Sequence, residues 1–301
     1  MLLVVTNTKP LRPARHRLVP ILIFITIGTA ITQSPLPQRI VSLVPAVTEI
    51  LVSIGAGSEL VGIGSFDQIP IGPNQDSSVT RVGGLLDPNV ERIFTLRPDL
   101  VILYDTQTDL RSQLEKASIP ILTYTHEGLA EVSDMIRLLG IRTGHSTEAE
   151  TIATELEASL VAIQRRVAGR PKPRTLLVFG REPLTLRNVY ASGGIGFLQD
   201  MLEVAGGNNV FSEIDSENVS QVSSESILSA APEIIIEIRY GENLPRNIVE
   251  DERAVWTQLS TLPAVRNNRI YFVTGNRFVV PGPRVAQATE ELARMIHPDA
   301  F

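Results

Sequence analysis

Along most of the chain, short apolar runs that predict buried strands alternate with amphipathic segments that predict helices. The first half contains expected strands at 39–44 (RIVSLV), 60–65 (LVGIGS), 100–103 (LVIL) and 120–124 (PILTY). Expected helices lie between them at 46–57, 90–96 and 129–140. This alternation is typical of a parallel sheet whose strands are connected through helices.

The second half repeats this order of elements. Strands are expected at 175–180 (TLLVFG) and 269–273 (RIYFV), and helices at 194–207 (GIGFLQDMLEVAGG) and 285–296 (VAQATEELARMI). Two α/β lobes with mainly parallel sheets are therefore the predicted fold, because each half can bury its own sheet between layers of helices.

A long amphipathic segment separates the two halves. Its apolar residues recur at helical spacing, at Ile152, Leu156, Leu160, Ile163 and Val167. Thr147 and Glu150 form a capping box at its start. A helix over 147–168 would be roughly 33 Å long at 1.5 Å per residue, enough to run the height of a domain. We expect one stiff backbone helix that holds the two lobes at a nearly constant separation.

These patterns divide the chain into five parts. We expect a signal peptide at 1–30, a spacer at 31–38, an N-terminal α/β lobe at 39–144, a bridging helix at 145–170 and a C-terminal α/β lobe at 171–301.

One 14-residue pattern occurs twice, at the same place in each half. NVERIFTLRPDLVI (89–102) is followed 134 residues later by SSESILSAAPEIII (223–236), which aligns Glu91 with Glu225. Each glutamate falls near the second position of a predicted helix, where the free amides and the helix dipole stabilise a carboxylate by about 0.3 to 1 kcal/mol. Helix capping alone explains either glutamate, but it does not explain why both occupy the same place in a duplicated unit.

The N-terminus has the layout of a secretory signal. Four basic residues precede the apolar run at 18–31, and Gly28-Thr29-Ala30 supplies small residues for cleavage. The run is shorter than the roughly 20 residues of a spanning helix, although an uncleaved anchor is the alternative reading. The chain has no cysteine, so lipid attachment, disulfides and thiolate chemistry are excluded. We expect a free, periplasmic protein.

The charge balance excludes nucleic acid and anionic lipid as partners. Without residues 1–30 the chain has 23 basic and 33 acidic residues, a net charge of −10. A surface of that sign repels polyanions.

Several ordered motifs resemble periplasmic substrate-binding proteins of ABC importers for cobalamin and ferric siderophores. They are RIVSLVPAVTEIL, VGIGSFDQIP, VGGLLDPNVERIFTLRPDLVI, ASGGIGFLQDMLEVAGGNNVF, QVSSESILSAAPEIII and PGPRVAQATEELARMIHP. The resemblance implies two lobes bridged by one helix, a ligand in the cleft between them, and slight closure on binding. It also implies that Glu91 and Glu225 contact an ABC permease dimer in the inner membrane, to which a monomeric carrier delivers its ligand.

The loops after the strands are the candidate ligand contacts, because ligands of open α/β sheets bind beyond the carboxyl ends of the strands. In the N-terminal lobe these loops contain Pro45, Ala46, Phe66, Leu85, Tyr104 and His126. In the C-terminal lobe they contain Arg181, Tyr190, Arg239, Tyr240, Arg277 and Phe278. Cobalamin members often have aromatic contacts, and here Leu85 and Val219 stand where the family suggests tryptophan.

Two readings of the cargo stay open. Apolar and aromatic residues fit a corrinoid, whereas Arg181, Arg187, Arg239 and Arg277 would pair with the carboxylates of a siderophore or of haem. His126 and Tyr104 could be axial ligands to haem iron, with a polar loop histidine as the plainer reading.

Other classes of site find little support. No pair of histidines has the spacing of a metal site, so we predict no bound metal and no resident cofactor. A secreted α/β enzyme is the competing class, but the sequence has neither a GxSxG motif nor a complete dinucleotide fingerprint. Trp256, the only tryptophan, is expected to be a packing residue.

Overall fold

The computed structural model describes residues 35–67, 79–125, 128–215, 219–239 and 245–301. The expected signal peptide, the first half of the spacer (31–34), His126 and Tyr240 lie outside the described residues. Residues Leu36–Phe301 form one compact unit with two sheets. We call each sheet, with the helices that cover it, the N-terminal and the C-terminal lobe; the residue boundaries between the lobes stay a prediction.

The N-terminal lobe is a five-stranded parallel sheet in the order β3-β2-β1-β4-β5. Its strands are β1 (Ile40–Ser42), β2 (Leu60–Ile63), β3 (Thr80–Arg81), β4 (Leu100–Tyr104) and β5 (Ile121–Tyr124). Its helices are α1 (Pro45–Ser53), α2 (Val90–Thr95), α3 (Thr108–Lys116) and α4 (Ala130–Thr143), with a 3-10 turn at Ala56–Glu59.

The C-terminal lobe is a six-stranded mixed sheet in the order β11-β10-β6-β7-β9, with β8 also paired to β6. Its strands are β6 (Arg174–Gly180), β7 (Val189–Ser192), β8 (Asn208–Asn209), β9 (Val219–Val222), β10 (Ile234–Arg239) and β11 (Ile270–Thr274). Its helices are α6 (Phe197–Val204), α7 (Ser224–Ala230), α8 (Arg246–Ala254), α9 (Pro263–Arg266) and α10 (Val285–Ile296). Among the described strands, β7 pairs antiparallel with β6 and β9 and the other pairings are parallel, so the sheet is mainly parallel.

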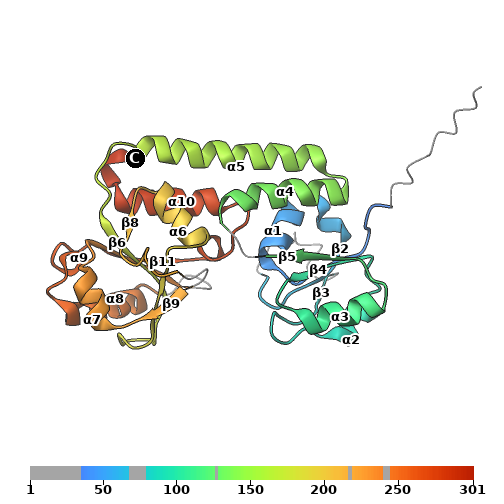
Figure 1. The fold of residues 1–301 in the computed structure, drawn as a ribbon, viewed down its shortest axis with the longest axis horizontal. Helices are drawn as coiled ribbons and strands as arrows, with labels where there is room; N and C mark the ends of the chain where they lie inside the picture. Colours follow the sequence, from blue (N-terminus) through green and yellow to red (C-terminus); the bar gives the residue numbers. More distant parts are fainter. Residues whose placement is uncertain (1–34, 68–78, 126–127, 216–218, 240–244) are drawn as a thin grey trace, which may run out of the picture. The chain divides into compact units, whose positions relative to one another are not determined.

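The central strands of both sheets are buried on both faces, because their alternate residues face opposite helix layers. In β4, Leu100 and Ile102 belong to one core cluster, while Val101 and Leu103 belong to another on the far face. In Figure 1, α1, α4, α5, α6 and α10 lie above the sheets, and α2, α3, α7 and α9 lie below them. The core cluster on the upper side of the sheets contains residues of both lobes, from Ile40 in β1 to Ile296 in α10. The two lobes therefore share one hydrophobic core.

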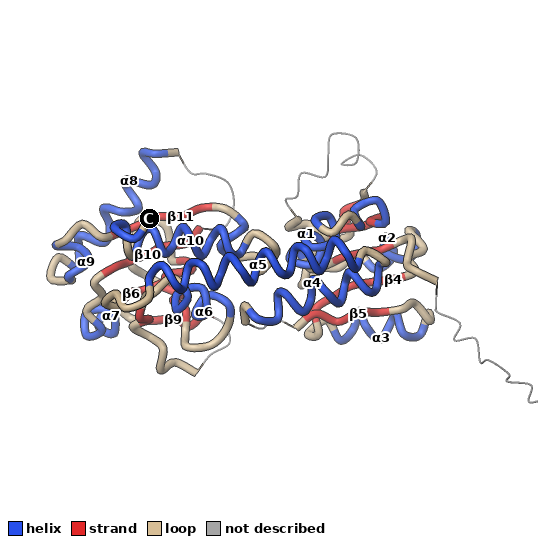
Figure 2. The backbone as a smooth tube through the Cα atoms, turned by 90° about the horizontal axis from the view of Figure 1, so that it is seen from above, coloured by secondary structure: helices blue, strands red, loops and turns tan. Residues whose placement is uncertain are grey.

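A single 22-residue helix, α5 (Ser146–Val167), runs over both lobes. It packs against α4 on one lobe and against α6 and α10 on the other, as the view from above shows (Figure 2). Its contact with α4 is close: a Cβ atom on Gly140 would lie 2.3 Å from the Cβ of Ala149. The structure confirms the predicted α/β fold of two lobes with mainly parallel sheets joined by one long backbone helix.

The duplicated 14-residue pattern forms the same substructure in each lobe. The caps Asn89 and Ser223 accept hydrogen bonds from the backbone N–H groups of Arg92 (2.9 Å) and Ser226 (3.1 Å), which starts α2 and α7 alike. Each helix then buries an isoleucine completely, at Ile93 and Ile227.

The end of the repeat is also shared. A residue with positive φ precedes the proline in both copies, with φ 46° at Arg97 and φ 43° at Ala231. An acidic side chain after the proline then accepts from the backbone at the start of the first strand of its lobe. Asp99 Oδ1 binds Arg39 N at 2.8 Å, and Glu233 Oε2 binds Arg174 N at 2.9 Å.

A partly buried ion pair connects the lobes. Glu49 of α1 is 7% exposed, and Arg284, just before α10, donates to both of its carboxylate oxygens at 2.7 and 2.9 Å. The Arg284 side chain is 46% exposed, so the two partners differ in how far each could be hydrated alone. The carboxylate depends on the arginine more than the arginine depends on the carboxylate.

This asymmetry predicts unequal losses of stability. Arg284→Gln leaves a buried carboxylate without its counter-ion and should lower the free energy of unfolding by about 3 kcal/mol. Glu49→Gln leaves a half-exposed guanidinium in contact with water and should cost about 1 kcal/mol. Urea denaturation of the two variants and of wild type measures both effects, and an equal or reversed order would contradict this account.

Candidate functional site

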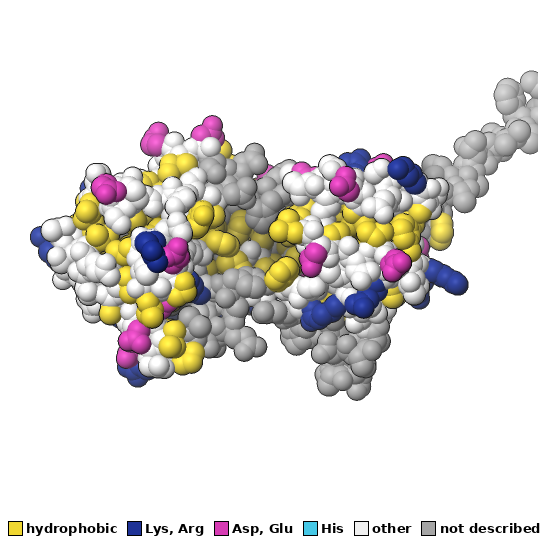
Figure 3. Space-filling model, turned by 90° about the horizontal axis from the view of Figure 1, so that it is seen from below, with side chains coloured by type: hydrophobic (Ala, Val, Ile, Leu, Met, Phe, Trp, Pro, Cys, Tyr) yellow, Lys and Arg dark blue, Asp and Glu magenta, His cyan; other side chains and the backbone are white. Residues whose placement is uncertain are grey.

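The candidate site is a cavity of about 730 Å³ between the two lobes. Fifteen residues line it: Leu43, Pro45, Ala46, Gly64, Phe66, Gly84, Leu85, Leu86, Asp87, Tyr104, Tyr124, Phe179, Val279, Val280 and Pro281. Seen from below, hydrophobic side chains gather in the hollow between the lobes (Figure 3). An apolar cavity of this size is typical of a binding site for a large small-molecule ligand.

The N-terminal wall of the cavity is built at the carboxyl ends of the parallel strands. Pro45 and Ala46 follow β1, Phe66 follows β2, and Tyr104 and Tyr124 are the last residues of β4 and β5. Parallel strands bring their carboxyl ends to one edge of a sheet, so residues far apart in sequence meet there. All five described candidates of this lobe, Pro45, Ala46, Phe66, Leu85 and Tyr104, line the cavity.

The loop between β3 and α2 forms the rim of this wall and is firmly braced. Gly83 has φ 93°, and a Cβ there would lie 2.3 Å from the Asp87 carbonyl oxygen, so the turn requires glycine. The buried Gln107 side chain donates to the Leu85 carbonyl at 3.0 Å and accepts from Tyr104 N at 3.1 Å. The position of Leu85 is thereby tied to the end of β4.

Apolar side chains are unusually exposed around the cavity. Leu86 is 94% exposed and Phe66 is 57% exposed. Deeper in the wall, the rings of Tyr104 and Tyr124 meet edge to face with centroids 5.8 Å apart. Exposed apolar groups concentrated at one site indicate a surface that a ligand or partner covers.

The C-terminal wall consists of residues that sequence reasoning missed. Phe179 lies near the end of β6, and Val279, Val280 and Pro281 follow the 3-10 turn at Asn276–Phe278. In this lobe the sequence points to loop residues, and it does not reveal which side chains at the end of a buried strand face the cleft. The apolar run at 278–281 was the available signal.

Arg181 and Arg239 belong to a buried ion cluster instead of the cavity wall. The Arg181 side chain is fully buried and pairs with Glu237 at 3.1 Å and Glu252 at 2.9 Å. Arg239 pairs with Glu237 at 2.8 Å. Burial raises the pKa of Glu237, and the positive charge of Arg181 opposes that rise. In this arrangement Arg181 is a structural residue.

The Trp256 side chain completes this cluster. It is fully buried, as expected for a packing residue, and its indole Nε1 donates to Glu237 at 3.0 Å.

The remaining candidates of the C-terminal lobe do not reach the cavity either. Arg277 forms a bidentate pair with Glu291 at 2.8 Å, and Arg187 pairs with Glu182 at 2.9 Å. Phe278 is completely buried, and Tyr190 is 41% exposed on β7 without lining the cavity. Among the described residues, no group of three or more histidine or acidic side chains could hold a metal ion.

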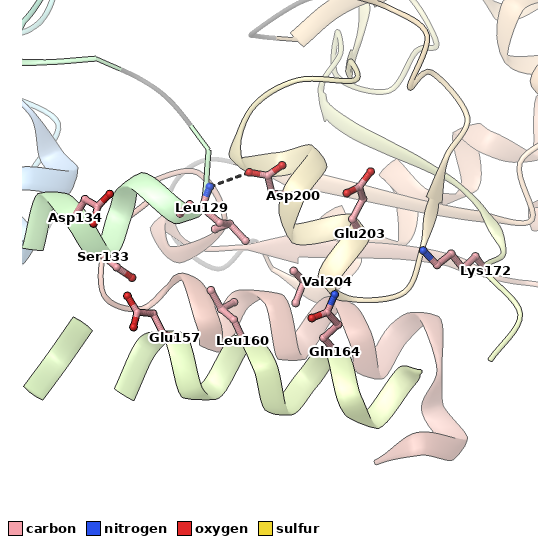
Figure 4. A pocket seen from close by; sticks show the side chains of 11 residues that line it. Leu129, Ser133, Asp134, Glu157, Leu160, Gln164, Lys172, Asp200, Glu203 and Val204 are labelled. Carbon is pink, nitrogen blue, oxygen red and sulfur yellow. Dashed lines mark hydrogen bonds between the residues drawn. The ribbon is translucent and has the colours of Figure 1, made fainter. Parts of the chain in front are cut away.

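A second cavity of about 570 Å³ lies against α5, with a different character (Figure 4). Its lining includes the carboxylates of Asp134, Glu157, Asp200 and Glu203, and the single cation Lys172. The Leu129 backbone N–H donates to Asp200 Oδ2 at 2.8 Å, which joins α4 of one lobe to α6 of the other. Its polar wall suits water and ions, so the apolar cavity is the better candidate for a large ligand.

Glu91 and Glu225 lie away from the cavity, at the second residue of α2 and of α7. Both side chains are exposed, and Figure 1 places α2 and α7 on the side of the molecule opposite α5. Hydrogen bonds from its own backbone N–H and from the Ser223 hydroxyl lower the pKa of Glu225. The two lobes therefore present one carboxylate each from equivalent helix starts.

Comparisons with known proteins give the family. The family model described as periplasmic binding protein matches residues 40–276. An uncharacterized ABC transporter substrate-binding lipoprotein of Bacillus subtilis (strain 168) is 29% identical over 270 residues, which are 88% of this chain and 82% of that protein. A vitamin B12-binding protein of Pectobacterium atrosepticum is 25% identical over 268 residues, 87% of this chain and 89% of that protein.

The solved structures include a periplasmic haem-binding protein of Pseudomonas aeruginosa with the same fold. It has a TM-score of 0.73 and 23% sequence identity, over 88% of this chain and 95% of that one. Within the described part of the chain, none of the helices combines the length and apolar character needed to cross a membrane.

Beside the cavity, Asp67 is a buried carboxyl group to which no described residue donates a hydrogen bond of standard length and angle. It is 2% exposed and directly follows Phe66. The nearby Thr48 hydroxyl donates to Ser42 Oγ at 2.7 Å instead. Burial raises the pKa of Asp67 from 3.8 to about 7, although the Thr48 hydroxyl, the Gly64 backbone and the charge of Arg81 act in the opposite direction.

This raised pKa predicts that the protein loses stability as the pH rises from about 4 to above 7. Folded Asp67 retains its proton over that range while the unfolded chain releases it, so the contribution present at low pH is lost through pH 7. The free energy of unfolding of Asp67→Asn, measured relative to that of wild type, should increase by roughly 2 to 4 kcal/mol between pH 5 and pH 8.

Urea unfolding of wild type and variant at both pH values measures this change. Asp109→Asn, an exposed site on α3, is the matched control and should follow wild type. A constant difference between wild type and Asp67→Asn across the range would refute the assignment.

Proposed function

The chain belongs to the periplasmic binding protein family, and from this premise we propose that it is the substrate-binding protein of an ABC importer for a corrinoid or a similar metal chelate. The observation that carries the proposal is the apolar cavity of about 730 Å³ between the two lobes. The protein captures the chelate there outside the cytoplasm and releases it unchanged to an inner-membrane permease. ATP hydrolysis is the task of the importer.

Cobalamin is the first candidate ligand for three reasons. The cavity volume falls within the range of roughly 300 to 1,000 Å³ that ligand sites occupy. Its wall offers the broad apolar contact that a corrin ring needs, from Phe66, Leu85 and Phe179. A curated relative at 25% identity is named as a vitamin B12-binding protein.

A ferric siderophore or haem is the second candidate. Tyr104 and Tyr124 both line the cavity, and a tyrosine phenol can ligate ferric iron. The haem-binding protein described above has the same fold, so the architecture is compatible with a flat iron chelate. The carrier role is common to both candidates, while the chelate differs.

The ligand is tested directly by binding. Purified protein is titrated with cobalamin, with haemin and with a panel of ferric siderophores, and absorbance shifts and calorimetry report binding. We expect one chelate to bind at a stoichiometry of one and to be recovered chemically unchanged. Phe66→Ser removes aromatic contact from a half-exposed side chain and should weaken that binding about tenfold. Conversion of the chelate, or binding of none of them, would rule out the carrier role.

We further infer that Glu91 and Glu225 are the docking contacts for the permease. Each carboxylate is exposed at the start of an equivalent helix, and the two helices belong to different lobes. A permease with two-fold symmetry offers two equivalent sites, which two copies of one substructure can match. Charged contacts of this kind set orientation and association rate more than ligand affinity.

The docking proposal predicts a separation between binding and delivery. Glu91→Ala/Glu225→Ala should bind its ligand within about twofold of wild type, because both residues lie outside the cavity, and lose delivery at least about tenfold. Ligand-dependent ATPase stimulation of the importer from the same organism, reconstituted in proteoliposomes, measures delivery.

Glu148→Ala/Glu155→Ala is the matched control, since it removes two exposed carboxylates from α5 on the other side of the molecule. The control should stimulate the importer as wild type does. Equal losses in both double variants would indicate a general charge effect and would exclude specific docking through α2 and α7.

A further inference from the structure

The wall of the interlobe cavity is nearly free of charge. Among the fifteen described residues that line it, Asp87 is the one charged side chain, and no lysine, arginine or histidine is present. Asp87 is held on the rim loop, because its Oδ1 accepts a hydrogen bond from Gly84 N at 3.1 Å. The only fixed charge in the described wall is therefore negative.

The arginines that sequence reasoning placed at the cleft are neutralised by carboxylates. Arg181, Arg239 and Arg277 are paired with Glu237, Glu252 and Glu291 at 2.8 to 3.1 Å. These partners are protein groups in fixed positions, and a ligand carboxylate would have to displace one of them. These ion pairs occupy the three arginines inside the protein, so none of the three is available to a ligand without breaking a pair.

Two further arginines lie close to the cavity wall without joining it. Arg284 is bound by both oxygens of Glu49. Arg81 lies behind the loop after β2, where its Nη1 donates to the carbonyl oxygens of Gly64 and Asp67 at 3.0 Å each. Both guanidinium groups serve to position the segments that form the wall.

The internal segments that lie outside the described residues add no basic side chain beyond one histidine. The internal segments outside the described residues, 68–78, 126–127, 216–218 and 240–244, contain His126 and no lysine or arginine. They contain four acidic residues, Asp76, Glu127, Glu217 and Glu242. The chain between the described parts therefore offers no arginine or lysine with which to bind a ligand carboxylate.

We propose that this cavity selects metal chelates that are neutral or positively charged and rejects those that carry negative charge. The proposal rests on the carrier function proposed above and specifies the charge of the cargo. An anionic group that leaves water for this wall loses its hydration without meeting a counter-ion. Asp87 adds repulsion at the rim. Chelates without a net negative charge, such as corrinoids with amide side chains, can present amides and apolar surface to this wall; cobalamin is neutral overall, because its one phosphodiester is balanced by the cobalt–corrin centre.

This selection also divides the candidate ligands. Haem has two propionates and ferric tris-catecholates carry a net negative charge, so both classes are disfavoured. Neutral or cationic ferric hydroxamates are accepted on the same grounds as corrinoids. The nature of the metal does not enter the selection, which acts on the outer surface of the chelate.

Ligand pairs that differ only in charge test the proposal. One pair is cobalamin and its monocarboxylic acid, in which a single side-chain amide is hydrolysed. A second pair is a linear ferric trihydroxamate with a terminal amine and the same chelate after succinylation. Calorimetry with wild-type protein should give at least about tenfold weaker binding for the anionic member of whichever pair binds. The part of this affinity difference that is due to repulsion by Asp87 should become smaller at high salt concentration.

The outcomes separate this inference from the function on which it rests. If neither member of either pair binds, and haemin and the catecholates do not bind, the carrier function fails. If an anionic member binds as tightly as its neutral or cationic partner, or haemin binds most tightly of all, the charge selection fails while the carrier function stands.

Asp87→Asn isolates the part played by the rim carboxylate. Asparagine keeps an oxygen that can accept from Gly84 N, so the loop retains its brace while the charge is removed. Because Asp87 is exposed, the affinity ratio within the bound pair should fall by only about twofold to fivefold. Asp109→Asn on α3 should leave the ratio as in wild type. An unchanged ratio in Asp87→Asn would overturn the role of Asp87 as a charge filter.

Discussion

The close packing of α5 over both lobes is the constraint on which the rest of the structure depends. α5 covers a core cluster that begins at Ile40 and ends at Ile296, and its contact with α4 leaves no room for a side chain at Gly140. Glu49 and Arg284 add a directed contact between the lobes below this layer. The spacing of the two cavity walls is thus a property of the packed core, and ligand binding need not create it.

The apolar character of the cavity follows from the way in which the fold pairs its charged side chains with one another. Arg181 forms ion pairs with Glu237 and Glu252 inside the C-terminal lobe, and Arg277 forms an ion pair with Glu291. Such pairs are costly to bury and become favourable only when the geometry satisfies both partners. Once these groups are satisfied internally, the described wall that remains for a ligand is made of aromatic, aliphatic, proline and glycine residues, with Asp87 as its one charged side chain.

Sequence reasoning correctly predicted the features that depend on local sequence patterns. The helix expected at 147–168 is observed at Ser146–Val167, and the duplicated segment forms matched caps, helices and strands. The rule that ligands bind at the carboxyl ends of strands predicted Pro45, Phe66 and Tyr104 as ligand contacts, and the structure places all three in the cavity wall, because position along a strand is enough to apply the rule. The family resemblance is confirmed by the match over residues 40–276.

Sequence reasoning could not predict ion pairs between residues that lie far apart in the sequence. Arg181 is 56 residues from Glu237 and 71 from Glu252, and no local pattern indicates that they meet. Phe179 was overlooked because a buried strand with apolar residues on both faces gives no sign of which end reaches a cleft. The charge of the cavity therefore depended on tertiary contacts, and the arginines that suggested an anionic cargo have other partners.

The unbroken core cluster has a consequence for how the molecule holds together as a whole. Its members come from both sheets, from α1 and α4 on one side and from α6 and α10 on the other. A fragment ending before α5 would leave half of this apolar layer in water, and so would a fragment beginning after it. The two halves resemble each other in topology, but because they share this core cluster we expect neither to fold on its own and the whole protein to unfold in one cooperative transition.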